Sequence, residues 1–123
     1  MWFVAWLIAC RPVDPASPSL VIVSPADGST VCGVPMHVEL DVQDFTLVPL
    51  SDGADVEPGT GHVDVYLNGQ AATMSEALSF DIPDVTPGAW QLRAELVNAD
   101  HTAIEPYVGD LIYVTVEAAA CGS

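Results

Sequence analysis

Hydrophobic and polar residues alternate in short runs from Leu20 onward, and this period of two is typical of β-strands. The pattern is clearest over residues 36–43 and 90–97, in which every second residue is apolar. In the second run Trp90 falls on the apolar face and Val97 on the polar face. We expect Trp90 to lie in a core; the alternative is that it stacks on a ligand.

Turn sequences separate the alternating segments. The run 25–28 (Pro-Ala-Asp-Gly) ends the first segment, and Asn68-Gly69 is typical of a type I′ hairpin turn. The segments that we predict as strands are residues 20–24, 36–43, 63–67, 70–74, 78–82, 90–97 and 112–116, with Leu78, Phe80 and Ile82 as one inward-facing set. About seven short strands pack most economically as two face-to-face sheets. We therefore expect an all-β fold, an immunoglobulin-like antiparallel β-sandwich.

The chain opens with an unbroken apolar run, Trp2 to Ala9, which leads into Cys10. The run is far shorter than the roughly 20 residues of a membrane-spanning helix and matches the hydrophobic region of a signal peptide. The sequence Leu7-Ile8-Ala9-Cys10 resembles the lipobox of bacterial lipoproteins. That resemblance implies cleavage after residue 9 and acylation of Cys10, whose lipid chains hold the domain on a membrane. The alternative is an uncleaved apolar N-terminus that packs into the core.

This interpretation divides the chain into four parts. Residues 1–9 are a signal peptide, and residues 10–19 are a lipid-anchored cysteine with a tether that three prolines keep extended. Residues 20–117 form the sandwich, and residues 118–123 are a C-terminal tail. We expect the protein in the bacterial cell envelope, with the domain facing the periplasm or the exterior.

Three cysteines are an odd number for an exported protein. Lipidation consumes Cys10 and leaves Cys32 and Cys121, which we expect to form a disulfide in an oxidising compartment. The alternative is that both remain unpaired thiols. The sequence has no CxxC pair, so these cysteines do not indicate a zinc site.

The charge balance is strongly acidic, with 17 Asp and Glu against only two cations, Arg11 and Arg93. Such a surface repels phosphate backbones, which excludes nucleic acid as a partner. It also repels anionic lipid headgroups, so any membrane attachment must come from a covalent or a hydrophobic anchor. The charge either serves solubility alone or attracts a cation or a basic envelope protein.

Two long connections, residues 45–61 and 99–109, fall at the same end of the predicted sandwich because antiparallel strands alternate in direction. They bring together a set of residues that could hold a divalent transition metal, the one cofactor we consider: His62, Asp64, Asp100 and His101. The alternative is that His62 and His101 are structural and each donates to a loop carbonyl. His37 lies on the polar face of another strand, where we expect it to be exposed.

Three stretches resemble small secreted bacterial immunoglobulin-like domains of unknown function. They are residues 24–31 (Ser-Pro-Ala-Asp-Gly-Ser-Thr-Val), 59–69 (Gly-Thr-Gly-His-Val-Asp-Val-Tyr-Leu-Asn-Gly) and 87–101 (Pro-Gly-Ala-Trp through Asp-His). His62 and His101 match histidines of that pattern. Asp64 and Trp90 stand where the pattern has histidine, so a site built on four histidines is half replaced here. The resemblance implies the fold and an envelope location.

The sequence carries none of the motifs of nucleophilic catalysis, such as a Gly-x-Ser-x-Gly elbow. We therefore do not expect an enzyme. The function that we predict is a membrane-anchored module that binds or adheres through the loop rim 45–61 and 99–109. The alternatives are a structural or assembly component of the envelope and a lipoprotein that binds a divalent metal.

Overall fold

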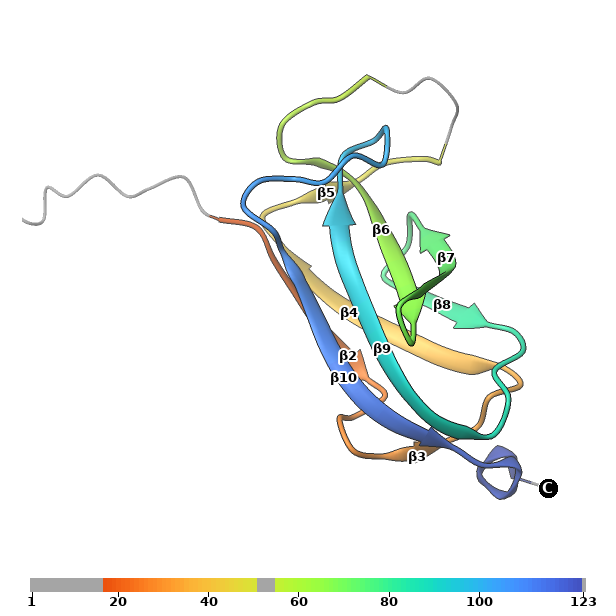
Figure 1. Cartoon of the computed structure of the whole chain (residues 1–123). Coiled ribbons are helices and arrows are strands. Elements are labelled where there is room, and N and C mark those ends of the chain that lie inside the picture. Colours follow the sequence, from red (N-terminus) through yellow and green to blue (C-terminus); the bar gives the residue numbers. More distant parts are fainter. Residues whose placement is uncertain (1–16, 51–54, 123) are drawn as a thin grey trace, which may run out of the picture.

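A computed structural model describes residues 17–50 and 55–122 of the chain. It confirms the predicted fold, since the described residues form two β-sheets packed face to face (Figure 1). The predicted signal peptide, Cys10 and most of the predicted tether lie outside the described residues. None of the helices among the described residues is long and apolar enough to cross a membrane.

The smaller sheet has the order β2-β4-β8, and all its pairings are antiparallel. Its strands are β2 (Ser19–Ser24), β4 (Met36–Gln43) and β8 (Ser79–Ile82). The larger sheet has the order β3-β10-β9-β6-β5, and β7 also pairs with β6. Its strands are β3 (Thr30–Val31), β5 (Thr46–Leu47), β6 (Thr60–Leu67), β7 (Gln70–Ser75), β9 (Gly88–Val97) and β10 (Gly109–Val116).

The core lies between the sheets and consists of the apolar residues that alternate along the strands. Val63, Val65 and Leu92 are fully buried, and Trp90 is partly buried against the same cluster. Two side chains depart from the predicted pattern. Leu78 is 45% exposed because it precedes β8, and Val97 is only 1% exposed because loops cover the outer face at the end of β9.

The segment that connects β2 to β3 covers one edge of the sandwich, because it passes from one sheet to the other. After β2 the chain crosses from the smaller sheet to the larger one, where β3 pairs in parallel with β10. The backbone N–H of Ile22 donates to the Asp110 carboxylate at 2.9 Å, and that of Tyr113 donates to Asp27 at 2.9 Å. These contacts occupy edge groups that would otherwise be open to pairing with another chain.

A disulfide joins Cys32, just after β3, to Cys121, the last residue of the 3-10 helix η1 (Ala118–Cys121). The two residues are 89 positions apart in the chain, so the loop that they close contains every strand from β4 to β10. Three alanines would not hold a helical turn alone. The disulfide and the hydrogen bond from Ala120 N–H to the Glu117 carbonyl fix this turn.

His37 is exposed on β4, as predicted, and both its ring nitrogens have partners. Nδ1 lies 2.7 Å from Asp81, and Nε2 lies 3.1 Å from Glu39. These hydrogen bonds, first that of Asp81 and then that of Glu39, raise the pKa of His37 above its ordinary value of 6.5.

We therefore expect an NMR titration to give His37 a pKa above 6.5, and Asp81→Asn to bring it back toward that value. Because the pKa of His37 is raised in the folded state, its contacts with Asp81 and Glu39 contribute fully to stability below about pH 6.5. This contribution is lost as the pH rises through the folded-state pKa. A His37 pKa at or below 6.5 in the unmodified protein would contradict the contacts described.

Candidate functional site

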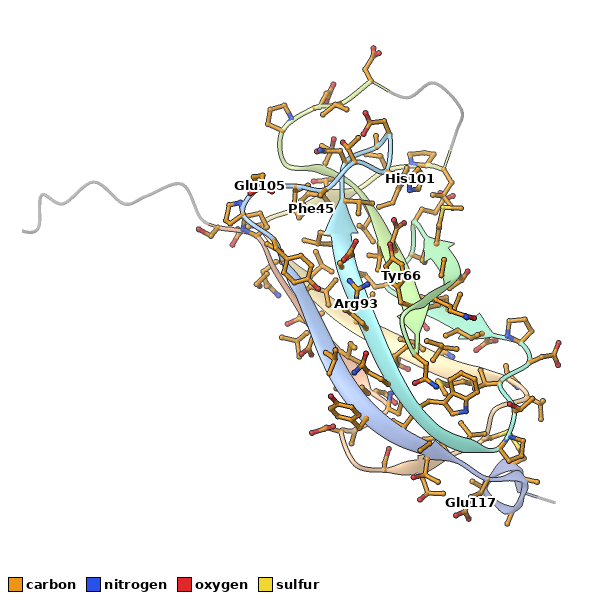
Figure 2. The ribbon with its side chains drawn as sticks, viewed as in Figure 1. Phe45, Tyr66, Arg93, His101, Glu105 and Glu117 are labelled. Carbon is orange, nitrogen blue, oxygen red and sulfur yellow. A yellow bond between two sulfur atoms is a disulfide. The ribbon has the colours of Figure 1, made fainter. Side chains whose placement is uncertain are left out.

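The two long connections meet at one end of the sandwich, as the alternation of strands predicted. Figure 2 shows Phe45, His101 and Glu105 at this end and Glu117 at the opposite end. A crevice of about 430 Å³ lies between the connections. Its lining is mostly apolar or uncharged: Pro18, Phe45, Val56, Pro58, Gly59, Asn98, Ala103, Ile104 and Glu105.

His62 belongs to the outer face of the larger sheet, yet it is fully buried. Two segments cover it. The chain at β5 runs parallel to the start of β6, with Val48 N–H donating to the Gly61 carbonyl at 2.9 Å, and then passes over the imidazole. The turn after β9 places the His101 ring on the other side, with 4.8 Å between the two ring centroids and 31° between the ring planes.

The two nitrogens of the His62 ring have different environments. Nε2 lies 3.1 Å from the backbone carbonyl oxygen of Pro49. A carbonyl oxygen only accepts hydrogen bonds, so Nε2 carries the proton of the neutral ring and Nδ1 carries a lone pair. That Nδ1 is buried, and it has no hydrogen-bond partner among residues 17–50 and 55–122. Leaving a buried polar atom unpaired costs about 1 to 3 kcal/mol.

His101 is held by a tight turn in the connection 99–109. Its backbone φ is +67°, in the left-handed region that few non-glycine residues adopt. Its N–H donates to the Asn98 carbonyl at 2.8 Å, and its Nδ1 lies 3.2 Å from the carboxylate of Asp64. The Asp64 side chain is only 16% exposed, and that of His101 is 36% exposed. The left-handed backbone therefore orients a partly accessible imidazole over a buried one.

Asp100 is directed elsewhere. One of its carboxylate oxygens accepts hydrogen bonds from the backbone N–H of Thr102 at 3.0 Å and from its hydroxyl at 2.6 Å. The hydroxyl first, and the N–H second, lower the pKa of Asp100. This carboxylate caps the turn that positions His101.

A second polar cluster lies next to Asp64 on the same face of the sheet. Glu95 on β9 is the cross-strand neighbour of Asp64 on β6. Its side chain forms an ion pair with Arg93. The Arg93 guanidinium also lies 4.1 Å from the centre of the Tyr66 ring, and the two side chains meet in the middle of the sheet (Figure 2). A hydrogen bond with Tyr107 is the main cause that raises the pKa of Arg93.

The carboxylates dominate the electrostatics of this surface. Burial raises the pKa of Tyr66, and the negative charges of Glu95 and Asp64 raise it further. Arg93 is the one Lys or Arg in the described part of the chain, and Glu95 already occupies it. The negative charge of Asp64 is therefore left to act on whatever approaches His101.

The structure brings together three of the four residues predicted for a metal site: His62, Asp64 and His101. Asp100 does not join them. Among the described residues no group of three or more His, Cys, Asp and Glu side chains is arranged to hold a metal ion. The predicted alternative, in which each of the two histidines donates to a loop carbonyl, holds for His62 through Pro49 but not for His101, whose Nδ1 lies beside Asp64. Sequence reasoning missed the Thr102 hydroxyl and Glu95. The first was detectable, because Asp two positions before Thr is typical of an Asx turn.

Three solved structures are similar to this chain, and the first of them supports the fold. The fibronectin(III)-like modules of Clostridium thermocellum CbhA match with a TM-score of 0.57 and 18% sequence identity, over 80% of this chain and 96% of that one. An engineered protein matches with a TM-score of 0.49 and 21% identity, over 84% of this chain and 21% of that one. CopC from Methylosinus trichosporium OB3b matches with a TM-score of 0.43 and 15% identity, over 82% and 94%.

The similarity to the CbhA modules shows a fibronectin III-like sandwich and extends no further than the fold. No protein-family model matches the chain, and no curated protein matches it. The resemblances to a lipobox and to secreted domains of unknown function therefore stay predictions.

Proposed function

We propose that this protein is an exported lipoprotein, anchored through Cys10, whose sandwich binds a partner at the surface of the same membrane without catalysing a reaction. The main support for the proposal is the position at which the N-terminal segment joins the domain. Pro18 lines the rim crevice, so the tether leaves the sandwich among the binding loops. The start of β2 lies at the rim, and the C-terminal end of the chain lies at the other end (Figure 1).

The cysteines support export and anchoring. Cys32 and Cys121 are joined, and a disulfide persists in oxidising compartments outside the cytoplasm. Cys10 is then the single remaining cysteine of the sequence, and it stands at the end of the apolar run. An unpaired free thiol is uncommon in an exported protein, whereas an acylated cysteine serves as a membrane anchor.

The position of the tether determines which surface faces the membrane. Residues 10–18 span at most about 28 Å at roughly 3.1 Å per residue in extended polyproline form. The rim is therefore closer on average to the anchoring membrane than the end that carries η1. Its exposed apolar side chains, Leu50, Val56 and Tyr107, are then presented to a partner held on that membrane.

A depth measurement on vesicles tests the proposal. The full chain is lipidated in a bacterial host, reconstituted in vesicles that contain quencher lipids, and carries a fluorescent non-natural residue at Val56 or, as the matched control, at Glu117. Both sites are exposed. Val56 lines the rim crevice together with Phe45 and Glu105, whereas Glu117 lies at the opposite end of the sandwich (Figure 2). We expect stronger quenching at Val56 than at Glu117, and loss of membrane association in the Cys10→Ser variant.

Two results would overturn the proposal. If Cys10→Ser remained with the membrane and no acylated Cys10 peptide appeared by mass spectrometry, the anchor would be wrong. If Glu117 were quenched as strongly as Val56 in the anchored protein, the rim would not face the membrane.

A further inference from the structure

We propose that His62 and His101 form a binding site for a divalent transition-metal ion, in which Nδ1 of His62 and Nε2 of His101 are the protein ligands. The proposal goes beyond the membrane-anchored binding function and does not depend on it, because the lipid anchor takes no part in the site. The remaining coordination positions are left to water or to a group from a bound molecule.

His62 provides the first proposed ligand atom. Its Nδ1 is a lone pair that is buried and unpartnered among the described residues, while Nε2–H is fixed by the Pro49 carbonyl 3.1 Å away. Metal-binding histidines show this arrangement, since the nitrogen that does not bind the metal usually donates to a carbonyl or a carboxylate. A bound ion would satisfy the lone pair and remove the cost of burying it.

His101 supplies the second nitrogen in the same manner. Its Nδ1 lies 3.2 Å from the Asp64 carboxylate, which accepts the Nδ1 proton and leaves Nε2 as the free lone pair. Asp64 is thus a positioning residue rather than a metal ligand, which differs from the role predicted from the sequence. The rings now stack with 4.8 Å between their centroids. In-plane lone pairs of stacked rings do not point at one ion, so binding requires the partly exposed His101 ring to rotate about its contact with Asp64.

The surroundings favour a cation over any other occupant. The Asp64 carboxylate lies 3.2 Å from His101, and its cross-strand neighbour is Glu95. The one guanidinium among the described residues is already paired with Glu95. Imidazole nitrogen suits zinc, copper and nickel, whereas calcium takes six to eight oxygen ligands. We therefore expect Cu²⁺ to bind more tightly than Zn²⁺, and Ca²⁺ not to compete.

His37 is a matched internal control. It is an imidazole beside two carboxylates, like the site, but Asp81 and Glu39 occupy both of its nitrogens and it has no second histidine next to it in the described structure. If charge and a histidine were sufficient for binding, His37 would bind as well as the proposed site does.

The experiment is a titration of the full chain in detergent by ZnCl₂, CuCl₂ and CaCl₂. The chain carries Cys10→Ser, which removes the one cysteine outside the disulfide. Nitrogen NMR of the imidazoles should show Zn²⁺ shifting Nδ1 of His62 and Nε2 of His101, with His37 unchanged. By calorimetry, His101→Asn and His62→Gln should each weaken Zn²⁺ and Cu²⁺ binding at least tenfold. Asp64→Asn should weaken it about 10- to 100-fold, as loss of such a partner does elsewhere. His37→Asn should have no effect.

Because His101 is partly exposed, His101→Asn is expected to fold even if His62→Gln does not, and circular dichroism will establish this. The proposal is overturned if neither Zn²⁺ nor Cu²⁺ binds, if His101→Asn binds as well as the unmodified site, or if the NMR shifts fall on His37. Failure of membrane anchoring would leave these results unchanged, so the two proposals are tested separately.

Discussion

Reduction of the Cys32–Cys121 disulfide is expected to lower the free energy of unfolding by about 4 to 5 kcal/mol, the largest effect we predict for a covalent change. The bond closes a loop across 89 positions, and the chain entropy that such a cross-link removes from the unfolded state grows with the length of the loop. Domains of this size are stable by only about 5 to 15 kcal/mol, so the reduced protein should be close to its unfolding limit.

Urea unfolding with and without a reducing agent measures this effect, and the thermal midpoint should fall on the order of 20 °C. A variant with Cys32→Ala and Cys121→Ala is the control, because it should be as unstable as the reduced protein and insensitive to the reducing agent. Equal stability of the oxidised and reduced forms would mean that the loop is already constrained by other contacts.

Gly61→Ala is expected to destabilise the domain by about 3 kcal/mol, the upper end of the usual cost of overpacking. A Cβ at Gly61 would lie 1.8 Å from the carbonyl oxygen of Val97 and 2.9 Å from its carbonyl carbon. Both neighbours are backbone atoms of the adjacent strand, so β6 and β9 must separate at the position that also holds His62. Chemical denaturation measures the loss, and the imidazole signals of His62 should move with it.

Gly59→Ala is the matched control, two residues away in the same connection. Gly59 has φ of +80° but open space where a Cβ would lie, so its substitution costs only the left-handed conformation, about 1 to 2 kcal/mol. If Gly59→Ala were as destabilising as Gly61→Ala, the close approach of the two strands would not be what requires glycine.

The strands were predictable where side chains alternate over many residues. The run 36–43 was predicted with the bounds of β4, because one face of that strand packs on the core and the other meets water. β3 and β5 were missed, since each has only two residues and pairs in parallel with a distant strand, which leaves no periodic signal. Val97 was assigned to the solvent face because periodicity cannot show that a loop covers it.

The candidate site was predictable only as far as topology determines it. Antiparallel alternation was enough to predict that His62 and His101 lie at one end of the molecule. It could not show that Pro49 occupies one nitrogen of His62, because that contact depends on the path of a loop. Asp100 seemed equivalent to Asp64 in the sequence, but its carboxylate is nearer to the N–H and hydroxyl of Thr102, and local hydrogen bonds take precedence.

The position of the disulfide limits how far the anchored domain can be stretched. Under tension applied between residue 18 and residue 122, force passes through the sulfur–sulfur bond, and residues 33–120 bear no load. Only residues 19–31 can be extended, which gives a contour length of about 45 Å at roughly 3.4 Å per residue. An uncrosslinked domain of a hundred residues would extend to about 340 Å. The disulfide therefore limits the extension of the domain under force to this short, fixed length.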